Sequence, residues 1–274
     1  MVELPEALLI AKQIDRELAG KKITSANFDN FNPNIMFMNV TPDEFIDRII
    51  NTKIVSSYAK AKWIFVKLDS NLILAIAPEM GANILYHENQ TTLPKKYHLQ
   101  LDFSDGSFFT LKCSGFLLMK LAKENELETM KYPGKIGKSP IDHEYTFDDF
   151  NALLDGHKKI IKAALLDDGN LSGVANYYLN DAFYRAKIHP KRKAFSLTSQ
   201  ERKNLFDSIR WVIGESIRLN GRSERKDLYG VHGKYERLIG PKNKNSPCSN
   251  CDTLIVKISV AGSNNYVCIN CQKL

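Results

Sequence analysis

Long apolar runs are absent from this sequence: none approaches the roughly 18 residues that a membrane span requires. The N-terminus also lacks the apolar segment of a secretory signal. Cysteine is scarce, with five in 274 residues, and Cys113 is the only one before residue 248. We therefore expect no membrane association and a reducing compartment, in which structural disulfides are rare. No internal repeat is visible.

The other four cysteines form two CxxC pairs near the C-terminus, at Cys248, Cys251, Cys268 and Cys271. This spacing is typical of a zinc ribbon, in which four thiolates surround Zn2+ at about 2.3 Å. The alternative is a pair of disulfides in a secreted protein. Four thiolate ligands leave no open position for water, so the pattern predicts a structural zinc. We expect a strand over 254–260, a turn over 261–265 and a return strand at 266–267.

The charge is unbalanced, at +7 with an isoelectric point near 9.0, which favours an anionic partner such as nucleic acid. The excess of basic residues is greatest over residues 222–244. Because this stretch also contains several glycines, we expect it to be a loop. Such a loop can be a solvated linker, or a hinge that contacts phosphates.

The first 130 residues have mostly β character. Pro5 fits the first turn of a helix that ends near Gly20. Strand signals follow over 54–68, 72–86 and 97–103, with a hairpin turn at Asp105-Gly106. The pattern predicts a β-sandwich preceded by one helix.

The following residues have helical character. Thr146 with Asp149, and Thr198 with Glu201, are capping pairs that predict helix starts. Helical stretches are expected over 158–166 and 171–188, and the last helix ends at Gly221. The predicted fold is thus α+β and multidomain: a β-sandwich domain over 1–130, a helical domain over 131–240 and a zinc ribbon over 241–274.

In combination, these features resemble the formamidopyrimidine-DNA glycosylase / endonuclease VIII family. The resemblance covers the whole chain in order. It rests on the N-terminal Met-Val-Glu-Leu-Pro-Glu, the β domain, Gly173-Val174-Ala175-Asn176 in the helical domain, and the four-cysteine ribbon. It implies that the helical domain is a helix-two-turns-helix element that binds DNA.

The resemblance also implies a reaction. In that family Met1 is removed and the new N-terminal amine attacks the sugar C1′ of a damaged nucleotide; here that amine would belong to Val2. A free α-amine has a pKa of about 8, so a useful fraction is unprotonated at neutral pH and can form a Schiff base. Glu3 would be the adjacent acid/base group. Alternatively, Glu3 is simply a carboxylate favoured at a helix N-terminus.

Four further residues match positions that contact DNA in the family. Lys62 resembles a lysine that grips the phosphate beside the lesion, and Asn176 an asparagine that holds another phosphate. Met80 resembles a residue that fills the gap left by the flipped nucleotide, and Phe116 an aromatic wedge. The simpler alternatives are an exposed strand lysine for Lys62, a turn residue for Asn176 and a core residue for Met80.

The chain departs from the family at three positions. Val2 replaces the usual proline, so the amine is primary and its imine must be protonated before it can withdraw electrons; we expect slower lyase chemistry relative to base removal. The arginine usual beside the wedge is absent from Cys113-Ser114-Gly115. Ser263 stands where the ribbon turn usually carries an arginine. The absence of these two arginines removes two cations that could contact phosphates, and it should weaken DNA binding, which already falls as the salt concentration rises.

Three functions remain open at this point. The first is a base-excision-repair glycosylase with abasic-site lyase activity, acting as a monomer on damaged double-stranded DNA in a bacterial-type cytoplasm, near the nucleoid. The second is a catalytically weakened relative that binds damaged or branched DNA, or structured RNA. The third is a zinc-ribbon protein that uses its basic face for protein contacts. The lesion-recognition loop cannot be identified from 168–170 or 222–235.

Overall fold

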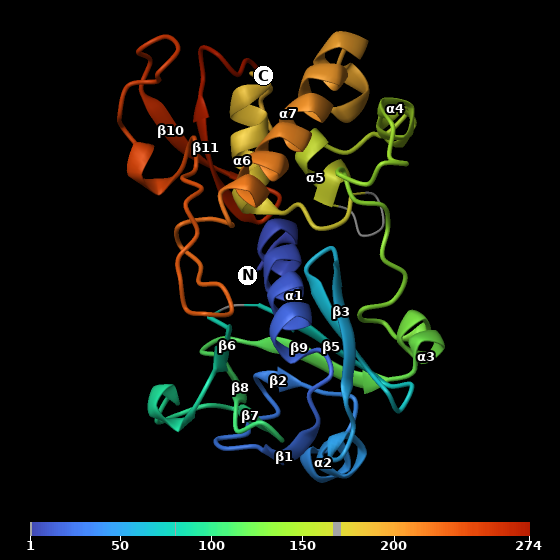
Figure 1. The fold of residues 1–274 in the computed structure, drawn as a ribbon. Coiled ribbons are helices and arrows are strands. Elements are labelled where there is room, and N and C mark those ends of the chain that lie inside the picture. The colour runs from blue at the N-terminus through green and yellow to red at the C-terminus, as the bar shows by residue number, and fades with distance from the viewer. Residues whose placement is uncertain (1, 80, 167–170) are drawn as a thin grey trace. The chain divides into compact units, whose positions relative to one another are not determined.

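The structure is a computed structural model and describes residues 2–79, 81–166 and 171–274. The chain divides into two compact units (Figure 1). The first comprises residues 1–136 and 219–234, and the second residues 137–218 and 235–274. This division differs from the predicted domains in two respects: the segment 219–234 belongs with the β-rich unit, and the zinc ribbon belongs with the helices.

The first unit begins with helix α1 (Leu4–Leu18), as predicted. Glu3 is its N-cap residue, and the Glu3 backbone amide donates to Glu6 Oε2 at 3.1 Å, which closes a capping box. Pro5 lies in the first turn, where its missing amide hydrogen costs nothing. The buried face of α1 packs against β3 and β4 of the sandwich.

Two sheets form the sandwich of this unit. The four-stranded sheet has the order β1 (Ile23–Asn27), β7 (Leu99–Phe103), β8 (Phe108–Lys112) and β6 (Asn83–His87). The five-stranded sheet has the order β2 (Met36–Phe37), β9 (Leu117–Ala122), β5 (Ile73–Pro78), β4 (Trp63–Leu68) and β3 (Ile54–Lys60). All pairs are antiparallel except β2 with β9. Helices α2 (Pro42–Ile49) and α3 (Glu124–Thr129) complete the unit.

Two of the predicted strands are in fact strand pairs. The stretch 54–68 turns at Ala61-Lys62, where Ala61 has a positive φ of 53°, and β3 and β4 form a hairpin. The stretch 72–86 breaks after Pro78, and its halves β5 and β6 join different sheets. Lys60 and Lys62 flank the first break, and Glu79 and Gly81 lie in the second, so the sequence carried a signal for both that the strand prediction did not use. Strands β1, β2 and β9 were not predicted.

The second unit contains α4 (Phe147–Leu154), α5 (Ile161–Leu166), α6 (Asn176–Arg185), α7 (Ser199–Arg218) and the hairpin of β10 (Ile255–Val260) and β11 (Ser263–Cys268). Both predicted capping pairs form: the Asp149 amide donates to Thr146 Oγ1 and the Glu201 amide to Thr198 Oγ1. Helices α5 and α6 are shorter than predicted. The ribbon turn is also shorter, with Ala261 and Gly262 at positive φ, so the return strand starts at Ser263 rather than Tyr266.

None of the helices in the described ranges is long and apolar enough to cross a membrane.

Candidate active site and zinc centre

The predicted nucleophile lies at the end of strand β5. The Val2 side chain belongs to the core of the sandwich and is 3% exposed, which anchors the backbone nitrogen. That nitrogen donates to the carbonyl oxygen of Pro78, the last residue of β5, at 2.9 Å. In the sequence as given, this nitrogen is the amide that joins Met1 to Val2. The position of the Val2 nitrogen is therefore set by a strand end and by a buried side chain.

Beside Val2, Glu3 and Glu6 share one buried cation. Glu3 and Glu6 are at most 4% exposed, and Arg222 is 5% exposed. The Arg222 guanidinium lies 3.7 Å from Glu3 Oε1 and 4.0 Å from Glu6 Oε1, and its backbone amide donates to Glu6 Oε1 at 3.2 Å. Buried carboxylates need such pairing, because an isolated buried charge is very costly. Arg222, the first residue of the basic stretch 222–244, thus has its charge buried against two carboxylates.

Glycines let the segment 219–234 approach α1 closely. A Cβ added to Gly221, which has a φ of 82°, would lie 3.3 Å from Glu6 Cγ. A Cβ on Gly233 would lie 2.1 Å from the Gly221 carbonyl oxygen, which is too close for any side chain. The glycines thus allow the segment 219–234 to pack closely within the first unit, and this segment is not a solvated linker.

Lys62 lies in the β3–β4 turn and forms a salt bridge with Glu79. The Lys62 side chain is 34% exposed, whereas that of Glu79 is 2% exposed. Glu79 directly follows Pro78, the residue that accepts the hydrogen bond from Val2. The candidate phosphate-binding lysine is therefore tied to a carboxylate next to the N-terminal segment, which no sequence motif had indicated.

Phe116 is half-buried and makes an edge-to-face contact with Phe37, whose exposed fraction is 43%. The loop before Phe116 packs on the loop after β5: the Ser114 amide donates to the Gly81 carbonyl oxygen, and a Cβ on Gly81 would lie 1.9 Å from Ser114 Oγ. The two loops predicted to contact the DNA gap are thus neighbours. Met80, the predicted gap-filling residue, lies outside the described residues.

In the second unit, Asn176 begins helix α6 and faces the ribbon turn. Its Oδ1 accepts from Lys162 Nζ at 2.6 Å and from Ser263 Oγ at 3.0 Å, and its Nδ2 donates to the Asn264 carbonyl oxygen at 3.1 Å. Lys162 is fully buried and also donates to Val260, Ser263 and Asn265. Burial lowers the pKa of Lys162 to about 8, so the amine remains mostly protonated at neutral pH. Sequence reasoning missed Lys162, although a lysine inside an apolar helical stretch was the available signal.

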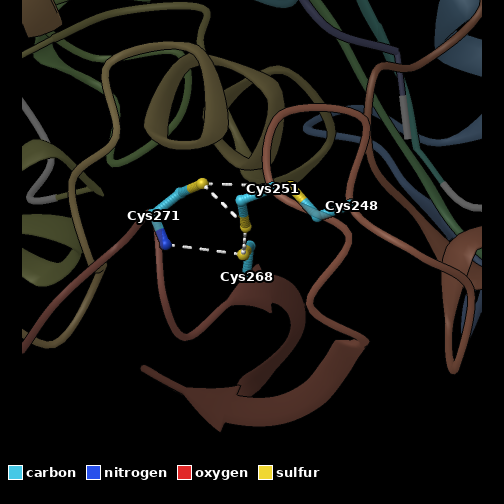
Figure 2. Close-up of side chains that lie close together, drawn as sticks. All are labelled: Cys248, Cys251, Cys268 and Cys271. Atoms are coloured by element: carbon cyan, nitrogen blue, oxygen red, sulfur yellow. Dashed lines mark hydrogen bonds between the residues drawn. The ribbon is translucent and has the colours of Figure 1, made fainter.

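The four ribbon cysteines converge as predicted (Figure 2). Their sulfurs all lie within 4.8 Å of one another, and the closest pairs are 3.3 to 4.0 Å apart. A tetrahedral zinc with 2.3 Å bonds needs sulfurs about 3.8 Å apart, whereas a disulfide needs about 2.05 Å. A hydrogen bond from the Thr253 side chain lowers the pKa of Cys251 to about 5, whereas burial raises the pKa of Cys271 to about 12. The cluster fits a structural zinc and not disulfides.

Three family models together match most of the chain. The formamidopyrimidine-DNA glycosylase N-terminal domain matches residues 1–114, and the helix-two-turns-helix domain of the same enzymes matches residues 136–227. The zinc finger found in these glycosylases and in isoleucyl-tRNA synthetases matches residues 245–274. The order of the three matches agrees with the predicted order of β domain, helical domain and ribbon.

Curated relatives and solved structures match along the full length. The formamidopyrimidine-DNA glycosylase of Desulforamulus reducens is 30% identical over 280 residues, covering 100% of this chain and 99% of the relative, and that of Chloroflexus aurantiacus is 30% identical over 277 residues, covering 99% and 98%. The Lactococcus lactis enzyme, solved with abasic-site DNA, superimposes with a TM-score of 0.89 at 24% identity, covering 99% of this chain and 100% of that one. With this identity over its whole length, the chain belongs to the formamidopyrimidine-DNA glycosylase family.

Proposed function

We propose that the protein is a DNA glycosylase that removes oxidised bases from double-stranded DNA and then cleaves the abasic site by β-elimination. Family membership along the whole chain supports this activity. Relatives of the same fold were solved with DNA containing an abasic site, Fapy-dG or carbocyclic 8-oxo-G. One observation carries the proposal. The Val2 nitrogen is held by a hydrogen bond to the Pro78 carbonyl oxygen at the end of β5, and the next residue, Glu3, provides a carboxylate.

The proposed nucleophile is the α-amine of Val2 after Met1 has been removed. Its nitrogen attacks C1′ of the damaged nucleotide, the base departs, and a Schiff base links protein and sugar. Glu3 delivers a proton to the sugar ring and then carries protons during strand scission. Because the amine is primary, the imine must be protonated before β-elimination, and strand cleavage is expected to lag behind base removal.

The proposed contacts with DNA are made by residues from each of the two units. Lys62 and Asn176 would bind phosphates, and Phe116 and Met80 would occupy the stack opened by the flipped nucleotide. The net charge of +7 favours the association. We place the protein in the bacterial cytoplasm at the nucleoid, acting as a monomer.

A second candidate is a DNA- or RNA-binding relative with little catalysis. Val2 in place of proline favours it, as do the missing arginine in Cys113-Ser114-Gly115 and Ser263 in the ribbon turn. It would bind damaged or branched DNA, or structured RNA, without releasing a base.

Borohydride trapping separates the two functions. Protein whose Met1 removal has been confirmed by mass is incubated with a duplex bearing an oxidised pyrimidine, 8-oxoguanine or an abasic site, and is then reduced. We expect a covalent adduct through Val2. Glu3→Gln should lose base excision by at least about 100-fold, as expected for a general acid/base, and should bind DNA nearly as well. Tight binding with no adduct on any of the three duplexes would favour the second candidate.

A further inference from the structure

Glu79 is a buried carboxylate beside the candidate nucleophile. It directly follows strand β5 and is 1% exposed. The preceding residue, Pro78, holds the Val2 nitrogen through its carbonyl oxygen at 2.9 Å. Glu79 and the N-terminal nitrogen are therefore anchored at the same strand end, inside the first unit.

The two oxygens of the Glu79 carboxylate have different surroundings. Oε1 forms the salt bridge with Lys62. Oε2 is buried, and among the residues that the structure describes it has no hydrogen-bond partner. Buried polar atoms are almost always hydrogen-bonded, and an unpaired one in a native protein needs an explanation such as strain, a catalytic role, or a bound water or ion. A carboxylate oxygen is a hydrogen-bond acceptor, so Oε2 can accept a hydrogen bond from a donor placed beside it.

The α-amine of Val2 is a donor of the right kind. A protonated primary amine carries three N–H groups, whereas the protonated amine of an N-terminal proline carries two. The Pro78 carbonyl oxygen can accept one of the three. A chain with valine at this position thus needs one more acceptor than a chain with proline, and Glu79 supplies an unused acceptor at the same strand end.

We propose that Glu79 binds the Val2 α-amine through Oε2 and serves as its general base, an inference that rests on the proposed function because it requires removal of Met1. Glu79 takes one proton from the ammonium, and the nitrogen lone pair then forms a bond to the aldehyde carbon of an abasic site. The carbonyl oxygen leaves as water, carrying the two hydrogens that the nitrogen has lost, one of them returned by Glu79. The product is a protonated imine, and Glu79 ends as a carboxylate.

A purely structural role for Glu79 is the competing explanation. In that case it would only neutralise Lys62 and stiffen the β3–β4 turn. The two roles differ in what happens to the amine itself, because a structural carboxylate would not change the titration of Val2.

The first experiment titrates that amine without DNA. In protein lacking Met1, with isotope-labelled valine, the Val2 Cα chemical shift is followed against pH in the wild type, in Glu79→Gln and in the control Glu88→Gln, which removes an exposed carboxylate of the same unit. The other charges around the amine, on Glu3, Glu6, Arg222, Arg225 and Lys62, are common to all three proteins. A neighbouring carboxylate favours the ammonium, so Glu79→Gln should lower the midpoint by about one pH unit, and Glu88→Gln should leave it unchanged.

The second experiment measures trapping on an abasic duplex across pH. Glu79→Gln should form the borohydride adduct at least about 10-fold more slowly at its best pH, which is within the range of a lost general base. The affinity of Glu79→Gln for the duplex should not fall, because Lys62 keeps its charge and no longer pairs with a carboxylate that competes with the DNA phosphate. Glu79→Asp should recover part of the rate.

The outcomes separate this inference from the proposed function. An unchanged amine midpoint in Glu79→Gln overturns the inference, whether or not the wild type forms an adduct. Absence of any wild-type adduct removes the lyase proposal, while the titration still decides whether Glu79 contacts the amine. If circular dichroism shows that Glu79→Gln does not fold, Glu79→Ala, which also removes the carboxylate, replaces it: a lowered midpoint supports the inference, and an unchanged midpoint overturns it.

Discussion

At the residue scale, the chemistry of the N-terminal site depends on how buried charges are paired. Two carboxylates, Glu3 and Glu6, lie against one guanidinium, that of Arg222. Arg225 interacts electrostatically with the same three side chains. Burial and the charge of Arg222 lower the pKa of Arg225, whereas the charges of Glu6 and Glu3 raise it. Arginine suits this position because its planar group can serve two carboxylates and stays charged when buried. Glu3 is thereby held in one place beside Val2.

Arg222→Met should leave these two carboxylates without their cation. We expect a loss of about 3–5 kcal/mol in the free energy of unfolding, which is the range for breaking a buried pair by removing one partner. Urea denaturation measures it, with Lys226→Met as the control, because Lys226 is an exposed cation in the same segment. Equal stability of the two variants would show that the buried pairing contributes nothing.

At the scale of elements, buried polar side chains connect segments that are far apart in the chain. Asp181 on α6 is fully buried and accepts hydrogen bonds from the Tyr235 hydroxyl at 2.8 Å and from the amides of Leu238 and Ile239 at 3.0 and 3.1 Å. Despite these donors, burial raises its pKa from 3.8 to about 6. The carboxylate fixes residues 235–239 onto α6 and makes the stability of the second unit depend on pH.

The sign of that dependence follows from the raised pKa. The folded protein holds the Asp181 proton more tightly than the unfolded chain, so this stabilisation is complete below about pH 4 and is lost as pH rises through about 6. Asp181→Asn lacks this titration. Between pH 5 and 7.5 the wild type should therefore lose about 1 kcal/mol relative to the variant. Denaturant unfolding of both proteins at several pH values measures the difference, and parallel curves would contradict the assignment.

At the scale of the whole molecule, each unit has its own source of stability. The first has a sandwich core that includes Val2 and α1. The second joins helices to a zinc ribbon: Tyr184 on α6 contacts Cys248 and Ser249 through its hydroxyl, and Asn180 accepts from the Tyr266 amide. So small a ribbon buries too little apolar surface to fold alone, and the metal should supply much of its stability.

Zinc removal should therefore act on the second unit. Cys268→Ser should lose the zinc and melt that unit at a lower temperature, leaving the β-sheet signal of the first unit in place. Metal analysis together with calorimetry and circular dichroism tests this. Cys113→Ser is the matched control, because Cys113 lies in the core of the first unit and should leave one zinc per chain bound. A single unchanged transition in Cys268→Ser would contradict a stabilising metal.

Features that depend on residues close together in the sequence could be predicted without the structure. Spacing was enough to predict the zinc ribbon, because its ligands are two pairs of cysteines in CxxC motifs. It was also enough for the start of α1 and the caps of α4 and α7, because their hydrogen bonds join residues only a few positions apart. Family resemblance then assigned roles to Val2, Glu3, Lys62 and Asn176, which stay proposals.

Which charged side chains form pairs became known only from the folded chain. Arg222 reaches Glu6 across 216 positions in sequence, and Lys162 reaches Ser263 across 101. Glu79 and Lys62 meet because β5 and β4 are neighbours in one sheet. A buried ion pair of this kind leaves no periodic or local signature: each partner alone resembles a solvated charge, and its energy appears only when the fold removes both from water.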